Sequence, residues 1–284
     1  MTEAEWLVCR KPGPMIEHLE VRVKAACRKL RLFGVACCRR VWHLLAHQQA
    51  RESVEVAELY ADGLVRAARL RTAQRKSSAL CKTLHLPPES TRMDRAACNA
   101  AVAADWVCAD DDRYRTNPRM NEVVPGGYAA AAAAYVAGAT ADAAFYATSQ
   151  GDDALDLAQR RNAEGLPTPA DPIWAAEEAA QSGLLRCIFG NPFRQPCPLP
   201  NALLAWSDET IPRLARSVYE ERRLPGGDFD PERLAVLADA LEDAGCEDEE
   251  LLAHVRSRGP HVRGCWAVEA LAGNEPDLAR SEWN

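Results

Sequence analysis

The sequence predicts an all-α protein built as a multi-helix bundle, and three observations support this fold class. Apolar residues recur at the three- and four-residue spacing of helices along much of the 284-residue chain. No stretch of useful length alternates apolar and polar residues as a half-buried strand does. Helix start and stop signals are frequent, and they are clearest between residues 230 and 273.

Three helices are expected in this C-terminal segment. Asp230 and Asp248 are acidic N-caps that begin the first two helices, because their carboxylates accept hydrogen bonds from free backbone N–H groups. Gly245 ends the first helix, since glycine readily takes the left-handed conformation found there. The third helix, within Pro260–Gly273, is similar to the second half of a HEAT-type repeat. HEAT-like helical packing is therefore an interpretation for the C-terminal end.

The earlier helices follow from the same signals. Thr2 and Glu5 form a capping-box pattern that begins a short first helix. Further helices are expected over Arg28–Leu45, residues 50–75 with a division at Gly63, Met93–Cys108, Tyr128–Thr148, Asp152–Asn162, Ile173–Phe189 ending at Gly190, and Ile211–Arg222 capped by Thr210.

A proline-rich stretch at residues 165–172 is the best domain boundary. It divides an N-terminal helical region, residues 1–165, from an acidic C-terminal helical region, residues 171–284. A single continuous domain is the alternative, because the chain length suits either arrangement.

The net charge of -7 hides an uneven distribution. Residues 1–85 contain 16 Lys/Arg and 8 Asp/Glu, whereas the rest of the chain contains 18 Lys/Arg and 33 Asp/Glu. Either the two parts neutralise each other, or the basic part meets nucleic acid or another anion.

The sequence also predicts the cellular compartment of the protein. The acidic N-terminus does not resemble a signal peptide, and no apolar stretch is long enough to span a membrane, so no membrane partner is expected. The eleven cysteines are then expected as thiols in a reducing cytoplasm.

Four residues in a stretch of twenty have the chemistry of a zinc site. They are Cys246, His254, His261 and Cys265, in the pattern C-x7-H-x6-H-x3-C. This spacing matches no common zinc finger. In the alternative interpretation the cysteines are buried apolar side chains, the histidines lie at helix ends, and there is no cofactor.

Two weaker patterns also suggest metal ligands. His43 and His47 stand four residues apart, but Leu44 occupies the position at which a metalloprotease needs a glutamate. Asp110–Asp112 lacks the alternation of a calcium-binding loop, so a solvated loop is expected there.

The helix expected at Arg28–Leu45 is basic and amphipathic. Such a helix either binds an anionic surface or packs in the core with a solvated basic face, and the core position is the more common one. The candidate anion-binding residues are Arg28, Arg31, Arg39 and Arg40.

The proline-rich Asn191–Pro200 segment is expected to run extended and to offer a contact for a protein partner. Its candidate residues are Asn191, Phe193 and Arg194. The favoured alternative is a structural corner, with Phe193 buried and Arg194 bound to backbone carbonyls.

Several stretches together resemble a bacterial family of uncharacterised proteins. They are residues 1–7, the Cys-Cys-Arg-Arg core of Arg28–Leu45, LLRCIFGNPF at residues 184–193, and GPHVRGCW at residues 259–266. The resemblance implies one intact unit, and it brings no known activity, cofactor or catalytic residue.

No phosphate-binding glycine loop and no nucleophile-elbow motif occurs, so a catalytic role is not expected. The leading hypothesis is a non-catalytic, cytoplasmic helical protein that binds another macromolecule, most simply a protein. The alternatives are a zinc-binding structural or hydrolytic protein and a nucleic-acid-binding protein that uses the basic helix.

Overall fold

The computed structural model describes residues 1–19, 27–84, 92–108, 171–194 and 199–273, together with residues 132, 136, 137 and 140. The α-helices are α1 (Glu3–Val8), α2 (Pro12–His18), α3 (Cys27–Arg40), α4 (Gln48–Ala61), α5 (Ala67–Thr83), α6 (Arg92–Val107), α10 (Asp171–Phe189), α11 (Asn201–Leu204), α12 (Trp206–Glu220), α13 (Pro231–Asp243), α14 (Glu249–Arg256) and α15 (Trp266–Leu271). A 3-10 turn, Trp42–Leu44, follows α3.

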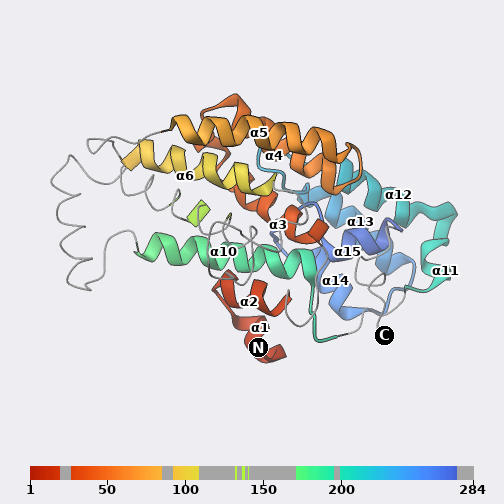
Figure 1. The fold of residues 1–284 in the computed structure, drawn as a ribbon. Coiled ribbons are helices and arrows are strands. Elements are labelled where there is room, and N and C mark those ends of the chain that lie inside the picture. The colour runs from red at the N-terminus through yellow and green to blue at the C-terminus, as the bar shows by residue number, and fades with distance from the viewer. Residues whose placement is uncertain are drawn as a thin grey trace, which may run out of the picture.

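The all-α prediction is confirmed. Over the described ranges, β pairing is limited to two isolated bridges, from Asp228 to Arg223 and from Asp228 to Val262. The helices pack against one another as a multi-helix bundle (Figure 1). The helix expected at Asp152–Asn162 lies outside the described residues, as do residues 110–112 and all but four residues of the one expected at Tyr128–Thr148.

Several of the predicted helix boundaries are confirmed, whereas α3 ends at Arg40 and not at Leu45, and α5 continues past residue 75 to Thr83. The Asp230 carboxylate accepts from the Glu232 N–H at 3.0 Å, and the Asp248 carboxylate accepts from the Leu251 N–H at 2.9 Å. Gly245 has a φ of 73°, the left-handed conformation in which L-residues with a Cβ are strained. The predicted cap at Thr210 is wrong, because its hydroxyl donates to the carbonyl of Ser207, three residues earlier, at 2.6 Å.

Helix α3 lies at the centre of the bundle. It packs against α4 and α6 on one side and against α10 on another, while α4, α5 and α6 lie side by side (Figure 1). Helices α12, α13, α14 and α15 form the C-terminal part, in which α12 and α13 contact each other, as do α13 and α14. Whether this packing belongs to the HEAT type stays a prediction.

One cluster of buried side chains runs through both of the expected regions. It includes Trp6, Phe33, Leu185 and Leu237, and it therefore crosses the proline-rich boundary expected at residues 165–172. Contacts of α10 with α2 and α3 cross the same point in the sequence. The C-terminal helices are thus packed against the N-terminal ones.

Candidate metal centre

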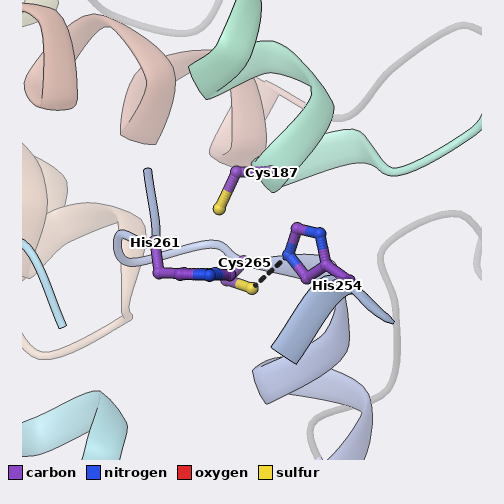
Figure 2. Close-up of side chains that lie close together, drawn as sticks. All are labelled: Cys187, His254, His261 and Cys265. Atoms are coloured by element: carbon purple, nitrogen blue, oxygen red, sulfur yellow. Dashed lines mark hydrogen bonds between the residues drawn. The ribbon is translucent and has the colours of Figure 1, made fainter. Parts of the chain in front are cut away.

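Two thiols and two imidazoles meet where the end of α10 contacts the C-terminal segment. Cys187 lies in the last turn of α10, His254 lies on α14, His261 follows the turn after α14, and Cys265 is the residue before α15. All four side chains point toward one centre (Figure 2). One ligand atom from each residue can be chosen so that the four atoms lie within 4.8 Å of one another.

The backbone around Cys187 is fixed by the first helix of the chain. The indole N–H of Trp6 donates to the carbonyl of Gly190 at 3.0 Å. The Arg186 guanidinium donates to the carbonyls of Trp6 and Cys9 at 3.0 and 2.9 Å. Because Trp6 is fully buried, these bonds hold the last turn of α10 in place.

The loop that carries His261 and Cys265 is also held by backbone hydrogen bonds. The Phe229 N–H donates to the carbonyl of His261 at 2.8 Å, and the Cys265 N–H donates to the carbonyl of Val262 at 3.0 Å. Gly264 has a φ of 87°, and a Cβ there would come 3.0 Å from the Leu32 side chain. Only glycine therefore fits this turn without moving α3.

The two nitrogens of His261 have different surroundings. Its Nε2 lies 3.1 Å from the backbone carbonyl of Ser257 and 3.1 Å from the Ser257 hydroxyl. Its Nδ1 is buried and has no hydrogen-bond partner. When Nε2 carries the proton and donates to the carbonyl, Nδ1 keeps a lone pair inside the protein. This is the arrangement of a metal-binding histidine, whose other nitrogen is oriented by a second hydrogen bond.

The electrostatics of the group favour a thiolate at Cys265. Burial, the largest single effect, raises the pKa of this thiol, but its contacts with Cys187, His254 and His261 together lower the pKa well below the ordinary value. The Nε2 atom of His254 lies 3.3 Å from the Cys265 sulfur, and a dashed line marks this contact in Figure 2. Burial and the same neighbouring sulfur raise the pKa of Cys187 well above its ordinary value.

The group is largely shielded from water. Cys187, His261 and Cys265 are buried, and His254 is half-buried. The ring centroid of Trp266 lies 5.3 Å from that of His254, which places an aromatic wall beside the imidazole. Gly190 allows this packing, because a Cβ there would come 3.1 Å from the Trp266 ring.

A buried lysine joins the elements on either side of the group. The Lys29 ammonium, on α3, donates to the carbonyl of Ile188 at 2.8 Å and lies 3.6 Å from the carboxylate of Glu269 on α15. Ile188 is the neighbour of Cys187, and Glu269 lies one turn after Cys265. Lys29 therefore links the two backbone segments that carry the thiols.

The separations between the four candidate ligand atoms suit a single, tetrahedrally coordinated ion. Bond lengths of about 2.3 Å to sulfur and about 2.0 Å to nitrogen put tetrahedral sulfurs about 3.8 Å apart and nitrogens about 3.3 Å apart. An arrangement in which no two ligand atoms are more than 4.8 Å apart reaches these distances by small side-chain rotations.

The structure brings together three of the four residues expected from the sequence. The fourth residue, and the second thiol, is Cys187 and not Cys246. Cys246 is half-buried in the turn between α13 and α14 and lies outside the group. Cys246 was the natural choice because it is close to His254 in the sequence. Cys187 is about 70 residues away from His254, so no local spacing points to it.

The metal pattern of His43 and His47 gains no support, and Asp110–Asp112 lies outside the described residues. His43 lies in the 3-10 turn and His47 precedes α4, because α3 ends at Arg40. The two histidines are therefore exposed on different elements and do not share one helical face. Among the described residues, the only group of three or more side chains close enough to hold a metal is the one around Cys265.

Helix α3 packs in the core, and most of its basic face is enclosed by other parts of the protein. Arg31 and Arg39 are buried, with the Arg31 guanidinium donating to the carbonyl of Val107 at 2.5 Å. The other three arginines form ion pairs. Arg28 pairs with Asp62 and Glu269, Arg39 pairs with Glu58, and Arg40 pairs with Glu177. All four guanidiniums are therefore bound by groups of the protein, and of the four only Arg40 is exposed.

The Asn191–Arg194 corner holds two helices together. Glu3 of α1 accepts hydrogen bonds from Asn191 at 2.6 Å and from Arg194 at 2.7 Å, and Arg194 also pairs with Glu250 of α14. Arg194 thus binds carboxylates and not the backbone carbonyls that were expected. Phe193 is 38% exposed and stacks on His18 at 4.8 Å, so it is not buried as expected. Residues 195–198 lie outside the described residues.

The fold and this side-chain group define an all-helical protein with a largely buried Cys2His2 cluster. Comparison of the chain with protein-family models, with curated proteins and with solved structures gave no match. The resemblance to a bacterial family therefore stays a prediction. Within the described ranges, the helices are all too short or too polar to cross a lipid bilayer.

Proposed function

We propose that this chain is a zinc-binding helical protein in which the metal has a structural role. One observation carries the proposal: two thiols and two imidazoles from three separate parts of the backbone meet within 4.8 Å in a largely buried site. Burial of a polar side chain without a partner costs free energy, and one cation bound to all four side chains offsets this cost.

The donor set favours zinc over other metals. Thiolate and imidazole ligands in tetrahedral geometry are typical of zinc, whereas calcium and magnesium require oxygen ligands. The short mutual distances favour a single ion, because a cluster of two irons separates its terminal ligands more widely. The unpartnered Nδ1 of His261 supplies the fourth lone pair without any rearrangement of the hydrogen bonds to Ser257.

A structural role fits better than a hydrolytic one. Catalytic zinc keeps one coordination position open for water or substrate, whereas four protein ligands complete a tetrahedron. The burial of Cys187 and Cys265 also leaves no direct route for a substrate. Zinc held here cross-links the end of α10 to α14 and to the start of α15, and it stabilises the C-terminal helices on the rest of the bundle.

The test is metal analysis of the full chain purified without a histidine tag. We expect about one zinc per chain in the wild-type protein, and a value near zero for Cys187→Ser. Cys246→Ser is the matched control, because it removes a neighbouring thiol outside the cluster, and it retains the full metal content. Because Cys187→Ser risks unfolding, the wild-type protein is also stripped of metal and reloaded with Co2+, which absorbs visible light when thiolates bind it tetrahedrally.

Wild-type protein with far less than one zinc and no cobalt spectrum would refute the proposal. Equal loss of metal from Cys246→Ser and Cys187→Ser would also refute it. Two expectations stay separate from this test: the protein-binding role and the cytoplasmic location. The second is part of our proposal, since thiol ligands stay available for metal in a reducing compartment.

A further inference from the structure

Helix α5 carries a concentration of positive charge that the zinc proposal does not use. Between Arg66, which precedes the helix, and Thr83, its last residue, there are six Lys/Arg and no Asp/Glu. All six cationic side chains are exposed: Arg66, Arg69, Arg71, Arg75, Lys76 and Lys82. Lys76 pairs with Glu52 at 3.3 Å, and within the described part of the chain the other five form no ion pair.

This charge pattern works against the helix itself. The first turn contains no acidic residue, although the N-terminus of a helix favours negative charge. Arg71 and Arg75 stand four residues apart, and like charges at this spacing repel each other. Features that weaken a local structure without helping the core are expected where the protein has a function.

Three of the cations form one line along the outer face. Arg71, Arg75 and Lys82 follow the i, i+4, i+11 spacing, so their side chains leave the same side of the helix. The line is about 17 Å long at 1.5 Å per residue. The opposite side of α5 is occupied, because Leu70, Ala73 and Ser77 are buried and the helix packs against α4 and α6.

The side chains between these cations are small or polar. The other exposed residues of α5 are Ala68, Thr72, Ala79 and Thr83. Neither a large apolar nor an aromatic side chain lies on this face. A membrane-bound helix needs apolar residues to enter the lipid, and a protein interface needs aromatic or aliphatic anchors. A basic, polar face without such anchors is typical of contacts with a phosphate backbone.

We propose that the outer face of α5 binds the sugar–phosphate backbone of a nucleic acid. A duplex carries one negative charge per 3.4 Å on each strand, so a line of about 17 Å lies against about five phosphates of a strand. In the view of Figure 1, helix α5 lies along one edge of the bundle. Contacts of this kind with phosphates fix the position of the protein on the duplex and carry no base-sequence information.

The proposal replaces the basic helix α3 with α5 as the nucleic-acid contact. It does not rest on zinc, since no residue of α5 belongs to the Cys2His2 cluster. A protein without metal at Cys265 would still bind nucleic acid through α5, and failure of one proposal leaves the other intact.

The experiment measures binding of the full chain to a fluorescently labelled duplex by anisotropy at several salt concentrations. The test variant is Arg71→Gln/Arg75→Gln/Lys82→Gln, which keeps residues of good helix propensity. The matched control removes three exposed arginines from the C-terminal part of the chain, at Arg213, Arg223 and Arg258, each also replaced by Gln. Both triple variants have the same net charge, so a difference between them reports the position of the charges.

We expect the wild-type protein and the control to bind alike, with affinity that falls steeply as salt rises. Each phosphate contact contributes about 0.9 to the slope of log K against log salt, so loss of three contacts lowers the slope by about 2.7. Between about 50 and about 200 mM salt, the α5 variant then loses about 40-fold less affinity than the wild type. Duplex RNA is tested in parallel and binds similarly if the backbone is what is recognised.

Three results would overturn the proposal. The first is no binding by the wild-type protein at low salt. The second is equal binding by the α5 variant and the control. The third is tighter binding to an acidic peptide or to anionic lipid vesicles than to either duplex at equal ionic strength, which would assign the basic face to another kind of partner.

Discussion

Of the glutamates in α4, Glu58 should destabilise the protein most when it is replaced by alanine. Glu58 is buried and accepts from the Arg39 guanidinium at 2.6 Å and from the Arg222 guanidinium. Arg39 belongs to α3, Glu58 to α4, and Arg222 follows α12. One carboxylate thus joins two N-terminal helices to the C-terminal part of the bundle.

The size of the expected stability loss follows from the two arginines that Glu58→Ala leaves without their carboxylate partner. Arg39 and Arg222 each already bury an Nε atom that has no hydrogen-bond partner. Burial lowers the pKa of Arg222 below its ordinary value even with Glu58 beside it, which shows how poorly this cation is solvated. Removal of one partner from a buried ion pair costs about 3–5 kcal/mol, out of about 5–15 kcal/mol for a whole domain.

The assay is urea unfolding at neutral pH, followed by helix ellipticity. We expect Glu58→Ala to lower the free energy of unfolding by about 3–5 kcal/mol. Glu55→Ala is the matched control on the same helix, where the side chain is exposed, and its effect should stay within about 0.5 kcal/mol. If Glu58→Ala and Glu55→Ala unfold at the same urea concentration, the buried ion cluster does not hold the two parts together.

Two further predictions concern pH and packing. Burial raises the pKa of the Cys108 thiol to about 12 from its ordinary value of 9.0, so the stability it contributes is complete below pH 9 and is lost as the pH rises toward 12. Thermal melts across this range should show a smaller alkaline loss for Cys108→Ala than for the wild type, and an unchanged pH profile would contradict the assignment. Gly227 has a φ of 85°, and a Cβ there would lie 2.5 Å from Cδ of Arg39, so Gly227→Ala should cost about 2 kcal/mol or more in urea unfolding. Gly13→Ala, in α2 with no atom within 4 Å, should be neutral or stabilising, and equal effects of the two substitutions would exclude the steric explanation.

Local features of the fold were predictable because their causes lie within a few residues. The caps at Thr2, Asp230 and Asp248 and the glycine stop at Gly245 all act within one helical turn. Apolar spacing then identifies helices without knowledge of their partners. Ser207, Asp208 and Glu209, near the start of α12, have positive φ, so regular right-handed helix follows Glu209, close to the expected start at Ile211.

Long-range partners were not predictable from the sequence. The arginines of α3 look like a solvated basic face until Glu58, Glu177 and Glu269 are placed beside them, and those glutamates are distant in the chain. The pattern of charges alone gave no sign that they would be buried. The basic face of α5 has a local cause and is visible in its composition, but only the packing against α4 and α6 shows which side is free.

The Cys2His2 cluster shows the same division between local and distant information. His254, His261 and Cys265 fall within one short stretch, and their spacing was sufficient to suggest a metal. The fourth ligand depends on how α10 lies against this stretch, which no spacing rule describes. The sequence therefore favoured Cys246, the thiol nearest to His254, in place of Cys187.

The distance in sequence between the two thiols has a consequence for biosynthesis. During translation at about 5–20 residues per second, Cys187 waits about 3–15 s before His254 and Cys265 follow it from the ribosome. The nascent α10 must carry an unpaired thiol through this interval, at a stage when its neighbours in the finished protein do not yet exist. Of the four residues of the proposed zinc site, an ion captured early would meet only Cys187, so under that proposal the site is completed only after Cys265 has been synthesised.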